Sequence, residues 1–242
     1  MKSMLTSSHL ITDSETLKAL MARDGYLYLQ GCLEQGAVLD LREEVLRCCA
    51  ANGWLLKGEP IFKGLGKTGG RVGGYNSAAF LSLQQRVQAT KAFCAVRNSS
   101  SIKQLLTGLL GPSWQSGEGD VLRVFLPQSG EVTAPHQDGF YMKAGSEPIW
   151  TVWVPLGECS TDVGGLSIKQ GSHRQGLLKH TKRGEDEDAQ LYDQPSDGWV
   201  TSHYHCGDCV IFHPWTIHRG EPNRTTRHLR LSADLRYRAT KI

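Results

Sequence analysis

Three stretches in the first half of the chain carry apolar residues at the three- and four-residue spacing of amphipathic helices. The first begins at a capping box, Thr12-Asp-Ser-Glu15, and ends at Asp24-Gly25. The second spans residues 33 to 51, and the third runs from Ser101 to Gly111-Pro112. We therefore expect a helical N-terminal portion over residues 1 to about 118.

Beyond residue 119 the pattern changes to short β-branched or alternating runs that Gly, Pro and Asp separate. The runs that predict strands are VLRVFL, IWTVWVPL, GGLSI, CVIF, WTIH and RLSADLRY, with an earlier short one at YLYL. No helical pattern comes between the later runs, which favours a sandwich or jelly roll over a parallel α/β sheet. We expect a single domain over residues 1–242, mainly β with flanking helices (α+β), whose β-rich core covers residues 119 to 242.

The composition is that of an ordinary globular protein, with 39% hydrophobic and 21% charged residues among 242. A net charge of +3 is too small to indicate a nucleic-acid groove. No run approaches the roughly 18 apolar residues of a membrane helix, and the first residues lack the apolar stretch of a secretory signal. Seven cysteines without framework spacing indicate reduced thiols. The sequence predicts a cytoplasmic protein with a small-molecule substrate and no nucleic-acid or membrane partner.

His136 and Asp138 lie two residues apart in the segment APHQDGFYM, behind a proline. In an extended segment they would point to the same side, into one cavity. With 9 histidines and 24 acidic residues in 242, about one histidine would have an acidic residue two positions later by chance. A metal site therefore needs a third ligand from elsewhere in the chain. His218 follows a strand-like run and is the preferred candidate, while His213, beside Pro214, is the alternative. Two histidines and one carboxylate form the ligand set of non-haem Fe(II) oxygenases.

Polar residues alternate with apolar ones along the last strand-like run, where Arg230, Ser232 and Asp234 share one face. A polar face inside a small barrel is unfavourable unless it meets a charged ligand. A guanidinium can bind a carboxylate through two hydrogen bonds, which a lysine cannot do. Arg230 is therefore the preferred anchor for an anionic ligand, and Arg227 is the alternative.

Together these motifs resemble the phytanoyl-CoA dioxygenase family of Fe(II)/2-oxoglutarate-dependent oxygenases, over nearly the whole chain. The matching segments are Asp24-Gly25-Tyr26, Leu109-Leu-Gly-Pro112, His136-Gln-Asp138, Trp153-Val-Pro-Leu156, Gly164-Gly-Leu166, Gly171-Ser-His173, His218 with Asn223, and Arg230-Leu-Ser232. Gln170 and Arg219-Gly220 depart from the residues common at these positions.

The resemblance implies a double-stranded β-helix, a cupin-like jelly roll, in which His136, Asp138 and His218 bind Fe(II). It also implies that Arg230 pairs with the distal carboxylate of the cosubstrate 2-oxoglutarate. Ser232 would assist that pairing, Trp153 would line the cosubstrate pocket, and His173 would order a turn.

The substrate is expected near the segment that follows the first two ligands. Phe140, Tyr141 and Met142 should border the cavity, with Arg123 reaching it from a neighbouring strand. This set favours a partly aromatic or aliphatic small molecule that carries negative charge.

The implied reaction is an O2-dependent oxidation, in its simplest form a hydroxylation, of an unactivated C–H bond, with release of succinate and CO2. A free small molecule of natural-product metabolism is preferred over a CoA thioester. Asp138 argues against a halogenase, in which a small residue leaves room for chloride. Three alternatives stay open: desaturation, cyclisation or epimerisation with the same cofactors; an AlkB-type nucleobase demethylase, which has a similar spacing to that of Arg230 and Arg236; and a non-catalytic jelly-roll metal-binding module.

Overall fold

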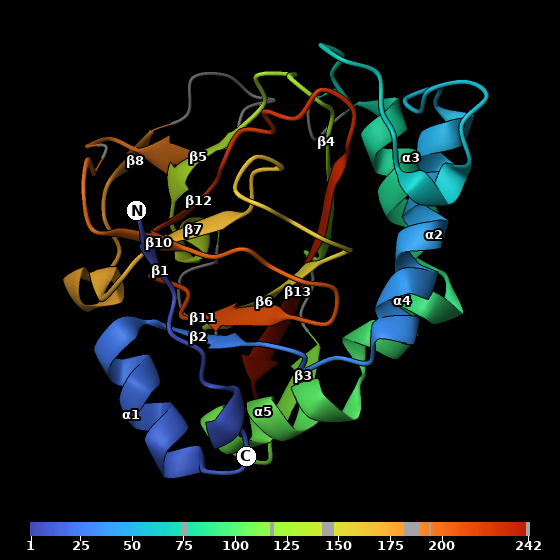
Figure 1. Ribbon diagram of the computed structural model, residues 1–242. Coiled ribbons are helices and arrows are strands. Elements are labelled where there is room, and N and C mark those ends of the chain that lie inside the picture. The colour runs from blue at the N-terminus through green and yellow to red at the C-terminus, as the bar shows by residue number, and fades with distance from the viewer. Residues whose placement is uncertain (74–76, 117–118, 142–147, 182–188, 194, 241–242) are drawn as a thin grey trace.

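Two facing β-sheets form the centre of the protein (Figure 1). The computed structural model describes residues 1–73, 77–116, 119–141, 148–181, 189–193 and 195–240. The larger sheet runs in the order β2-β11-β6-β13-β3, and β4 also pairs with β13. Its strands are β2 (Tyr26–Leu29), β3 (Trp114–Ser116), β4 (Val121–Phe125), β6 (Ile149–Pro155), β11 (Cys209–Phe212) and β13 (Arg230–Ala239).

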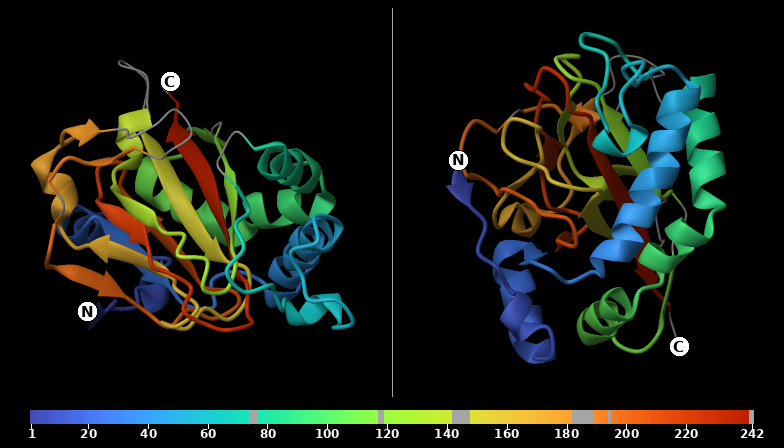
Figure 2. Two further views of the ribbon diagram at one scale, coloured as in Figure 1. Left: turned by 90° about the horizontal axis from the view of Figure 1, so that it is seen from above. Right: turned by 45° about the vertical axis from the view of Figure 1, so that its right-hand side comes forward.

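The smaller sheet lies opposite, in the order β1-β10-β7-β12-β5. Its strands are β1 (Lys2–Ser3), β5 (Thr133–His136), β7 (Leu166–Lys169), β10 (Trp199–Thr201) and β12 (His218–Gly220). β8 (His180–Thr181) and β9 (Gln190–Leu191) form a separate antiparallel pair. The two sheets together confirm the predicted jelly-roll architecture, and Figure 2 shows them from above and from the side.

The alternation along β13 divides its side chains between two environments. Leu231, Ala233 and Leu235 enter the apolar core that the larger sheet shares with the helices. The even-numbered residues from Arg230 to Arg236 point to the opposite face, as side chains of one strand must. A second apolar cluster, which includes Trp153, fills part of the space between the sheets. The polar face of β13 therefore lies inside the jelly roll, as the sequence predicts.

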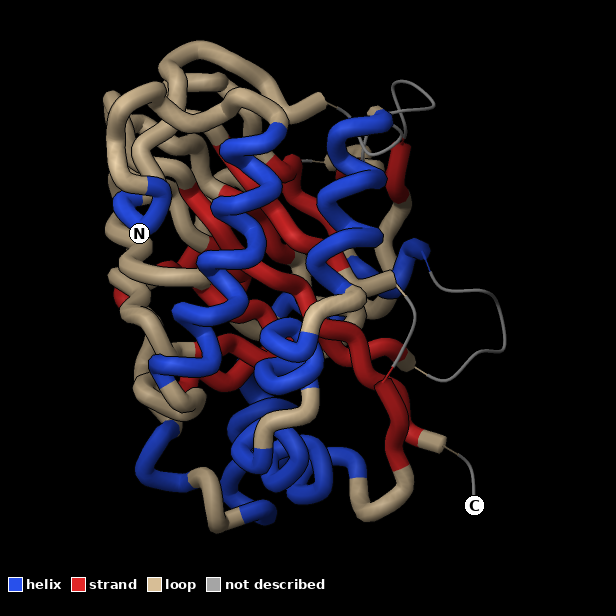
Figure 3. The backbone as a smooth tube through the Cα atoms, turned by 90° about the vertical axis from the view of Figure 1, so that its right-hand side faces the viewer, coloured by secondary structure: helices blue, strands red, loops and turns tan. Residues whose placement is uncertain are grey.

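Helices cover the outer face of the larger sheet (Figure 3). They are α1 (Ser14–Asp24), α2 (Gln35–Ala51), α3 (Ala78–Gln88), α4 (Lys91–Arg97) and α5 (Ser100–Leu110). Short 3-10 helices occur elsewhere in the chain: η1 (Ser8–Leu10), η2 (Ile61–Lys63), η3 (Asp138–Tyr141) and η4 (Ser172–Gln175). α2 buries Val38, Leu41 and Val45 against the sheet core. None of the described helices combines the length and the hydropathy that crossing a bilayer would require.

Three details of the secondary structure differ from the prediction. The N-cap of α1 is Asp13 and not Thr12, because the Asp13 carboxylate accepts hydrogen bonds from the backbone and hydroxyl of Thr16. Helices α3 and α4 were not predicted, since each buries only two apolar residues in its own length. The run WTIH is not a strand: Thr216 closes a turn onto His213, and β12 begins only at His218.

Candidate active site

The predicted metal ligands converge between the two sheets. β5 ends at His136 and β12 begins at His218, and the register of this antiparallel pair sets the two residues opposite each other. The imidazole Nε2 atoms lie 3.6 Å (His136) and 3.7 Å (His218) from Oδ1 of Asp138. All three side chains are buried. The structure therefore brings together the three residues that the sequence selected.

Asp138 reaches this position by a route that the sequence did not predict. The strand ends at His136, and Asp138 opens the 3-10 helix η3 instead of continuing an extended segment. Gly139 donates its backbone N–H to the carbonyl of Pro214 at 2.8 Å, which fixes the turn. A Cβ at Gly139 would lie 2.8 Å from the Trp215 ring, so this close approach requires glycine.

The backbone sets the tautomers of the two histidines. Nδ1 of His136 lies 2.8 Å from the carbonyl of Ala134, and Nδ1 of His218 lies 3.1 Å from that of Thr216. A carbonyl can only accept, so each Nδ1 carries the proton and donates it. Nε2 is therefore the nitrogen of each ring that faces Asp138 and is left for a metal.

The electrostatic environment favours the ligand forms of Asp138 and His218. Burial lowers the pKa of His218 to about 3, and the neighbouring His136 acts in the same direction, so that the ring is neutral. Burial by itself would raise the pKa of Asp138. The positive charge of the Arg236 guanidinium is the main opposing influence, and the pKa of Asp138 is held well below its usual value. The cluster presents the neutral His218 ring and an ionised carboxylate beside His136.

Arg236 and Thr151 hold the other oxygen of Asp138, and sequence reasoning missed both roles. The Arg236 guanidinium donates to Oδ2 of Asp138 and to Oγ1 of Thr151, and the Thr151 hydroxyl donates to Oδ2 at 2.6 Å. Arg236 and Thr151 are paired across β13 and β6. The available signal was the alternation itself, because Arg236 is the next even-numbered residue after Asp234 on the polar face.

Arg230 occupies the far end of the same face of β13. It is only 1% exposed, and its Nε donates to the carbonyl of Gly164 at 3.1 Å. Its guanidinium lies over the rings of Phe125, at 4.6 Å, and Trp153, at 5.8 Å. The alternative anchor, Arg227, lies on the surface and pairs with Glu59 at 2.9 Å. The structure thus brings Arg230, and not Arg227, into the interior.

Two polar atoms near Arg230 are buried without a hydrogen-bond partner among the described residues. They are Oγ of Ser232, two residues along the same face of β13, and Nε1 of Trp153. A buried donor without a partner is unfavourable, and native structures usually satisfy it with a ligand or water. The surroundings of Arg230 therefore offer polar groups to an anionic ligand.

Of the residues expected to border the substrate, Phe140 and Tyr141 lie close to histidine rings near the ligands. Phe140 stacks on the His180 ring with centroids 4.6 Å apart. Tyr141 is 49% exposed, its ring lies 6.4 Å from that of His136, and its hydroxyl accepts from the backbone of Ala189. Met142 lies outside the described residues.

Arg123 is engaged within the protein. Its Nε donates to Oδ2 of Asp234 at 2.7 Å, and the same Asp234 oxygen lies 3.8 Å from Arg236. The pair joins Arg123 to the charged face of β13. A substrate contact for Arg123 stays a prediction, and this internal partner competes with it.

The remaining histidines singled out in the sequence have other contacts. His213, the alternative third ligand, packs against the rings of Trp150 and Trp215 and does not join the cluster. Nε2 of His173 lies 3.0 Å from the carbonyl of Ala22, and a Cβ at Gly25 would overlap its ring. His173 therefore orders the contact between η4 and the end of α1, in line with the turn-ordering role expected for it.

Comparison with known proteins identifies the family. The family model described as phytanoyl-CoA dioxygenase (PhyH) matches residues 21–231. The chain belongs to the phytanoyl-CoA dioxygenase family. As a member, the protein is an iron- and 2-oxoglutarate-dependent oxygenase.

Three known proteins are similar to this chain over most of its length. The 1-deoxypentalenic acid 11-beta-hydroxylase of Streptomyces exfoliatus is 24% identical over 242 residues, which cover 94% of this chain and 82% of that protein. The epimerase SnoN, solved with Fe3+, alpha ketoglutarate and nogalamycin RO, is 23% identical with a TM-score of 0.65, over 93% of this chain and 83% of SnoN. EvdO2 from Micromonospora carbonacea var. aurantiaca, solved with 2-oxoglutarate, is 19% identical with a TM-score of 0.66, over 99% and 94%.

The described residues fit the two groups that family membership implies. Two imidazole nitrogens and one carboxylate oxygen, with ligand atoms within 4.8 Å of one another, suit a ferrous ion and leave further coordination positions open. The buried Arg230 and the unsatisfied groups of Ser232 and Trp153 suit the carboxylate of 2-oxoglutarate.

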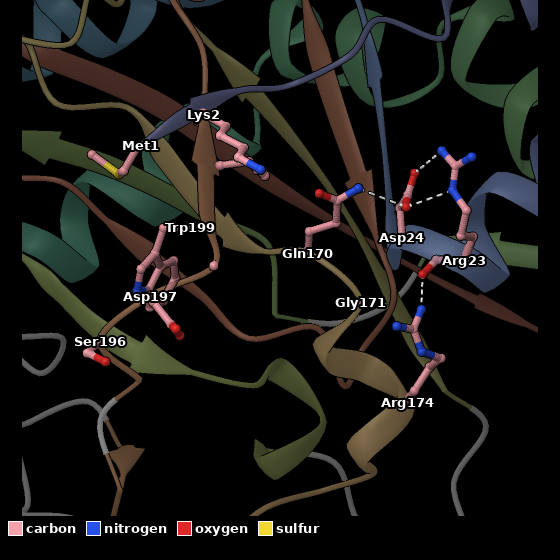
Figure 4. Close-up of a pocket in the computed structure, with 12 residues that line it drawn as sticks. Met1, Lys2, Arg23, Asp24, Gln170, Gly171, Arg174, Ser196, Asp197 and Trp199 are labelled. Atoms are coloured by element: carbon pink, nitrogen blue, oxygen red, sulfur yellow. Dashed lines mark hydrogen bonds and ion pairs between the residues drawn. The ribbon is translucent and has the colours of Figure 1, made fainter.

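A separate cavity of about 770 Å³ opens on the surface beside the N-terminus (Figure 4). Its charged side chains hold one another: Arg23 pairs with Asp24 at 2.6 Å, Gln170 donates to Asp24 at 2.9 Å, and Arg174 donates to the carbonyl of Arg23. Residues of the candidate active site do not line it. These contacts tie the end of α1 to η4, so we assign them to the fold.

Proposed function

We propose that this enzyme hydroxylates an unactivated C–H bond of a small molecule in natural-product biosynthesis, with release of succinate and CO2 from 2-oxoglutarate. The convergence of His136, Asp138 and His218 beside the buried polar face of β13 carries this proposal. The hydroxylase named among the relatives supports the choice of reaction.

The three ligands would hold Fe(II) through Nε2 of both histidines and Oδ1 of Asp138. The bound metal, with 2-oxoglutarate and O2, supplies the oxidising power that breaks the C–H bond. The Ala134 and Thr216 carbonyls keep the imidazole lone pairs directed at the metal position. Arg236 and Thr151 keep Oδ2 of Asp138 occupied, which leaves Oδ1 for the metal.

Arg230 would pair with the distal carboxylate of 2-oxoglutarate. Its Nε already donates to the Gly164 carbonyl, and the guanidinium packs over the Phe125 ring at 4.6 Å. The Ser232 hydroxyl and the Trp153 indole N–H, both buried without a partner among the described residues, would donate to the same ligand. Because Arg230 is buried, its charge is little screened and a carboxylate there is bound more strongly than at the surface.

Phe140 and Tyr141 would border the substrate on the side of η3. Their rings lie 5.4 Å apart in an edge-to-face arrangement and continue to the His180 ring. Such a wall favours a substrate with an apolar ring or chain next to the reacting carbon.

A second outcome with the same cofactors is epimerisation. SnoN has a comparable fold and is an epimerase, and the carbocyclase SnoK has a comparable fold as well, so cyclisation stays beside epimerisation as an alternative. Hydroxylation and epimerisation would both begin with removal of a hydrogen atom from carbon. Hydroxylation then adds oxygen at that carbon, whereas epimerisation returns a hydrogen atom to it and needs an added reductant to supply the two electrons that the substrate does not give to O2.

Anaerobic loading with Fe(II) and 2-oxoglutarate, followed by exposure to O2 with a panel of terpenoid, polyketide and glycosylated acceptors, tests the proposal. Succinate should rise above the uncoupled background, and mass spectrometry should detect a product 16 Da heavier for hydroxylation or of unchanged mass for epimerisation. His136→Ala should abolish both signals, while His228→Ala, which removes an exposed imidazole, should leave them intact. Retained turnover in His136→Ala would contradict the ligand assignment.

A further inference from the structure

A second group of two histidines and one carboxylate lies on the surface, away from the active-site ligands. Among the described residues, Glu158, His203 and His205 each offer one ligand atom, and these atoms lie within 4.8 Å of one another. Nε2 of His203 is 3.5 Å and Nδ1 of His205 is 2.8 Å from the same Glu158 oxygen, Oε2. We propose that these three side chains form a second metal site, which takes a divalent transition ion, specifically Zn²⁺.

One of the two separations, 3.5 Å for His203, matches what a tetrahedral zinc ion requires, and the other, 2.8 Å for His205, is a hydrogen-bond distance that a bound metal would lengthen. With Zn–N and Zn–O bonds of about 2.0–2.2 Å, two ligands on one tetrahedral ion lie about 3.3–3.5 Å apart. The distance from His203 to Oε2, 3.5 Å, lies at the upper end of that range, and the distance from His205, 2.8 Å, lies below it. Small side-chain rotations would equalise them, and these side chains, each between 53% and 65% exposed, have room to rotate. Water can fill the fourth position.

The backbone beneath the site is fixed. Cys159 and Tyr204 exchange two backbone hydrogen bonds, at 2.8 and 3.1 Å, in an isolated antiparallel bridge. In such a bridge the neighbours of the paired residues point to the opposite face. Tyr204 is fully buried and its hydroxyl donates to the carbonyl of Leu166 at 2.7 Å. His203 and His205, on either side of Tyr204, are therefore held outward beside Glu158.

Further contacts fix the direction of the donor atoms. The backbone N–H of His205 donates to the buried Asp208 at 2.9 Å, which also accepts from the Tyr28 hydroxyl at 2.7 Å. The backbone N–H of Cys206 donates to Oε1 of Glu158, so that Oε2 is the oxygen turned to the histidines. Asp138 is arranged in the same way, with one oxygen held by the protein and the other facing two imidazoles.

An ion pair alone explains the arrangement less well. Exposed ion pairs contribute little, about 0–1 kcal/mol, and one imidazolium would satisfy one carboxylate oxygen. Here two imidazole rings stack at 4.7 Å, with an interplanar angle of 18°, and both direct a nitrogen to one oxygen. A second protonated ring at that separation would repel the first, whereas one divalent ion between the three atoms attracts all of them.

A metal here would connect two parts of the larger sheet. Glu158 follows β6, and His203 and His205 precede β11, the direct neighbour of β6 in the sheet. Zn²⁺ is favoured over Fe²⁺ at an exposed nitrogen-rich site by the usual order of divalent affinities. Zinc bound at this surface site would stabilise the fold by linking these two segments.

Titration of the metal-free full-length chain with ZnCl2, followed by isothermal calorimetry, tests the proposal. The double variant His203→Ala/His205→Ala should bind one Zn²⁺ fewer per chain than the unmodified protein, and the control His9→Ala, which removes another exposed imidazole, should bind the same number. Equal stoichiometry in the unmodified protein and the double variant would overturn the proposal.

A thermal measurement checks the site independently of the active-site ligands. In a His136→Ala/His218→Ala background, Zn²⁺ at about 100 times its dissociation constant should raise Tm by roughly 5 °C. The shift should disappear when His203→Ala/His205→Ala is added. If this background does not fold, the calorimetric comparison still decides, because its variants change only exposed side chains. A Zn²⁺-induced shift that survives the loss of both surface histidines would also contradict the site.

Discussion

The guanidinium of Arg236 donates to Oδ2 of Asp138, the carboxylate oxygen that is not the nearest to the two histidines. Both side chains are buried, and the positive charge of Arg236 offsets the burial of the Asp138 carboxylate. Asp138 is thus ionised and oriented by the fold, before any metal is bound.

Arg236→Lys should weaken metal binding at the proposed site by about 10- to 100-fold, because a lysine keeps the charge but loses the planar hydrogen-bonding geometry. Anaerobic titration with Fe(II), or with Co(II) as a spectroscopic substitute, measures the dissociation constant directly. Arg224→Lys changes an exposed arginine and serves as the control. Unchanged affinity in Arg236→Lys would show that Thr151 alone is enough to orient Asp138.

Arg230→Lys should raise the KM for 2-oxoglutarate by about 10- to 100-fold while the affinity for Fe(II) stays the same, because only the carboxylate anchor is altered. Arg227→Lys should change neither quantity, since Arg227 pairs with Glu59 on the surface. Succinate formation at varied 2-oxoglutarate gives the KM. The reverse result, with Arg227→Lys impaired and Arg230→Lys normal, would exchange the two assignments.

Gly164→Ala should disturb the position of Arg230. Gly164 has φ of +85°, and a Cβ there would lie 2.5 Å from the carbonyl oxygens of Glu221 and Pro222. Its own carbonyl accepts from Arg230, so a shift of this backbone moves the anchor. We expect a loss of about 1–3 kcal/mol in the free energy of unfolding and weaker 2-oxoglutarate binding.

Gly130→Ala is the control for Gly164→Ala, because it introduces the same backbone strain without the steric overlap. Gly130 also has positive φ, +70°, but a Cβ there meets nothing within 4 Å. Chemical denaturation and calorimetry with 2-oxoglutarate should find a mild stability loss in Gly130→Ala and unchanged binding. Equal effects of the two substitutions would mean that the Gly164 carbonyl does not hold Arg230.

His213 should make the stability of the metal-free protein depend on pH. Burial lowers the pKa of His213 to about 4, against about 6.5 in an unfolded chain. Between these values the unfolded chain binds the proton that the folded protein excludes, so stability falls as pH falls from 6.5 to 4. His213→Gln should therefore lose less Tm between pH 7 and 4.5 than the unmodified protein. Parallel Tm curves would rule out a contribution from His213.

The site residues that the sequence could predict are those whose chemistry depends on local spacing. His136 and Asp138 are two residues apart, and the polar face of β13 follows from alternation within one strand. His218 could be selected because it stands at the junction of a strand-like run and a polar turn. Each of these inferences needs only neighbours in the chain.

The contacts that the sequence could not predict are set by pairing between distant strands. Thr151 reaches Asp138 only because β6 pairs with β13 in the register that sets Thr151 opposite Arg236. Arg123 meets Asp234 through the pairing of β4 with the same strand. Helices α3 and α4 were missed for a related reason, since few of their own residues are buried and their place against the sheet stabilises them.

The ten residues of β13 build the apolar core with one face and carry the charged groups of the proposed site on the other, two tasks that many enzymes divide between scaffold and loops. A shift of the β13 register by one residue would turn Arg230 and Arg236 into the apolar core and Leu231 into the polar space between the sheets. Burial of the apolar residues therefore enforces the correct register. On the proposed assignment, 2-oxoglutarate would meet charges that are already in place, and little ordering would be left for binding to accomplish. Redesign for other acceptors would then leave this strand untouched and alter the rim around η3.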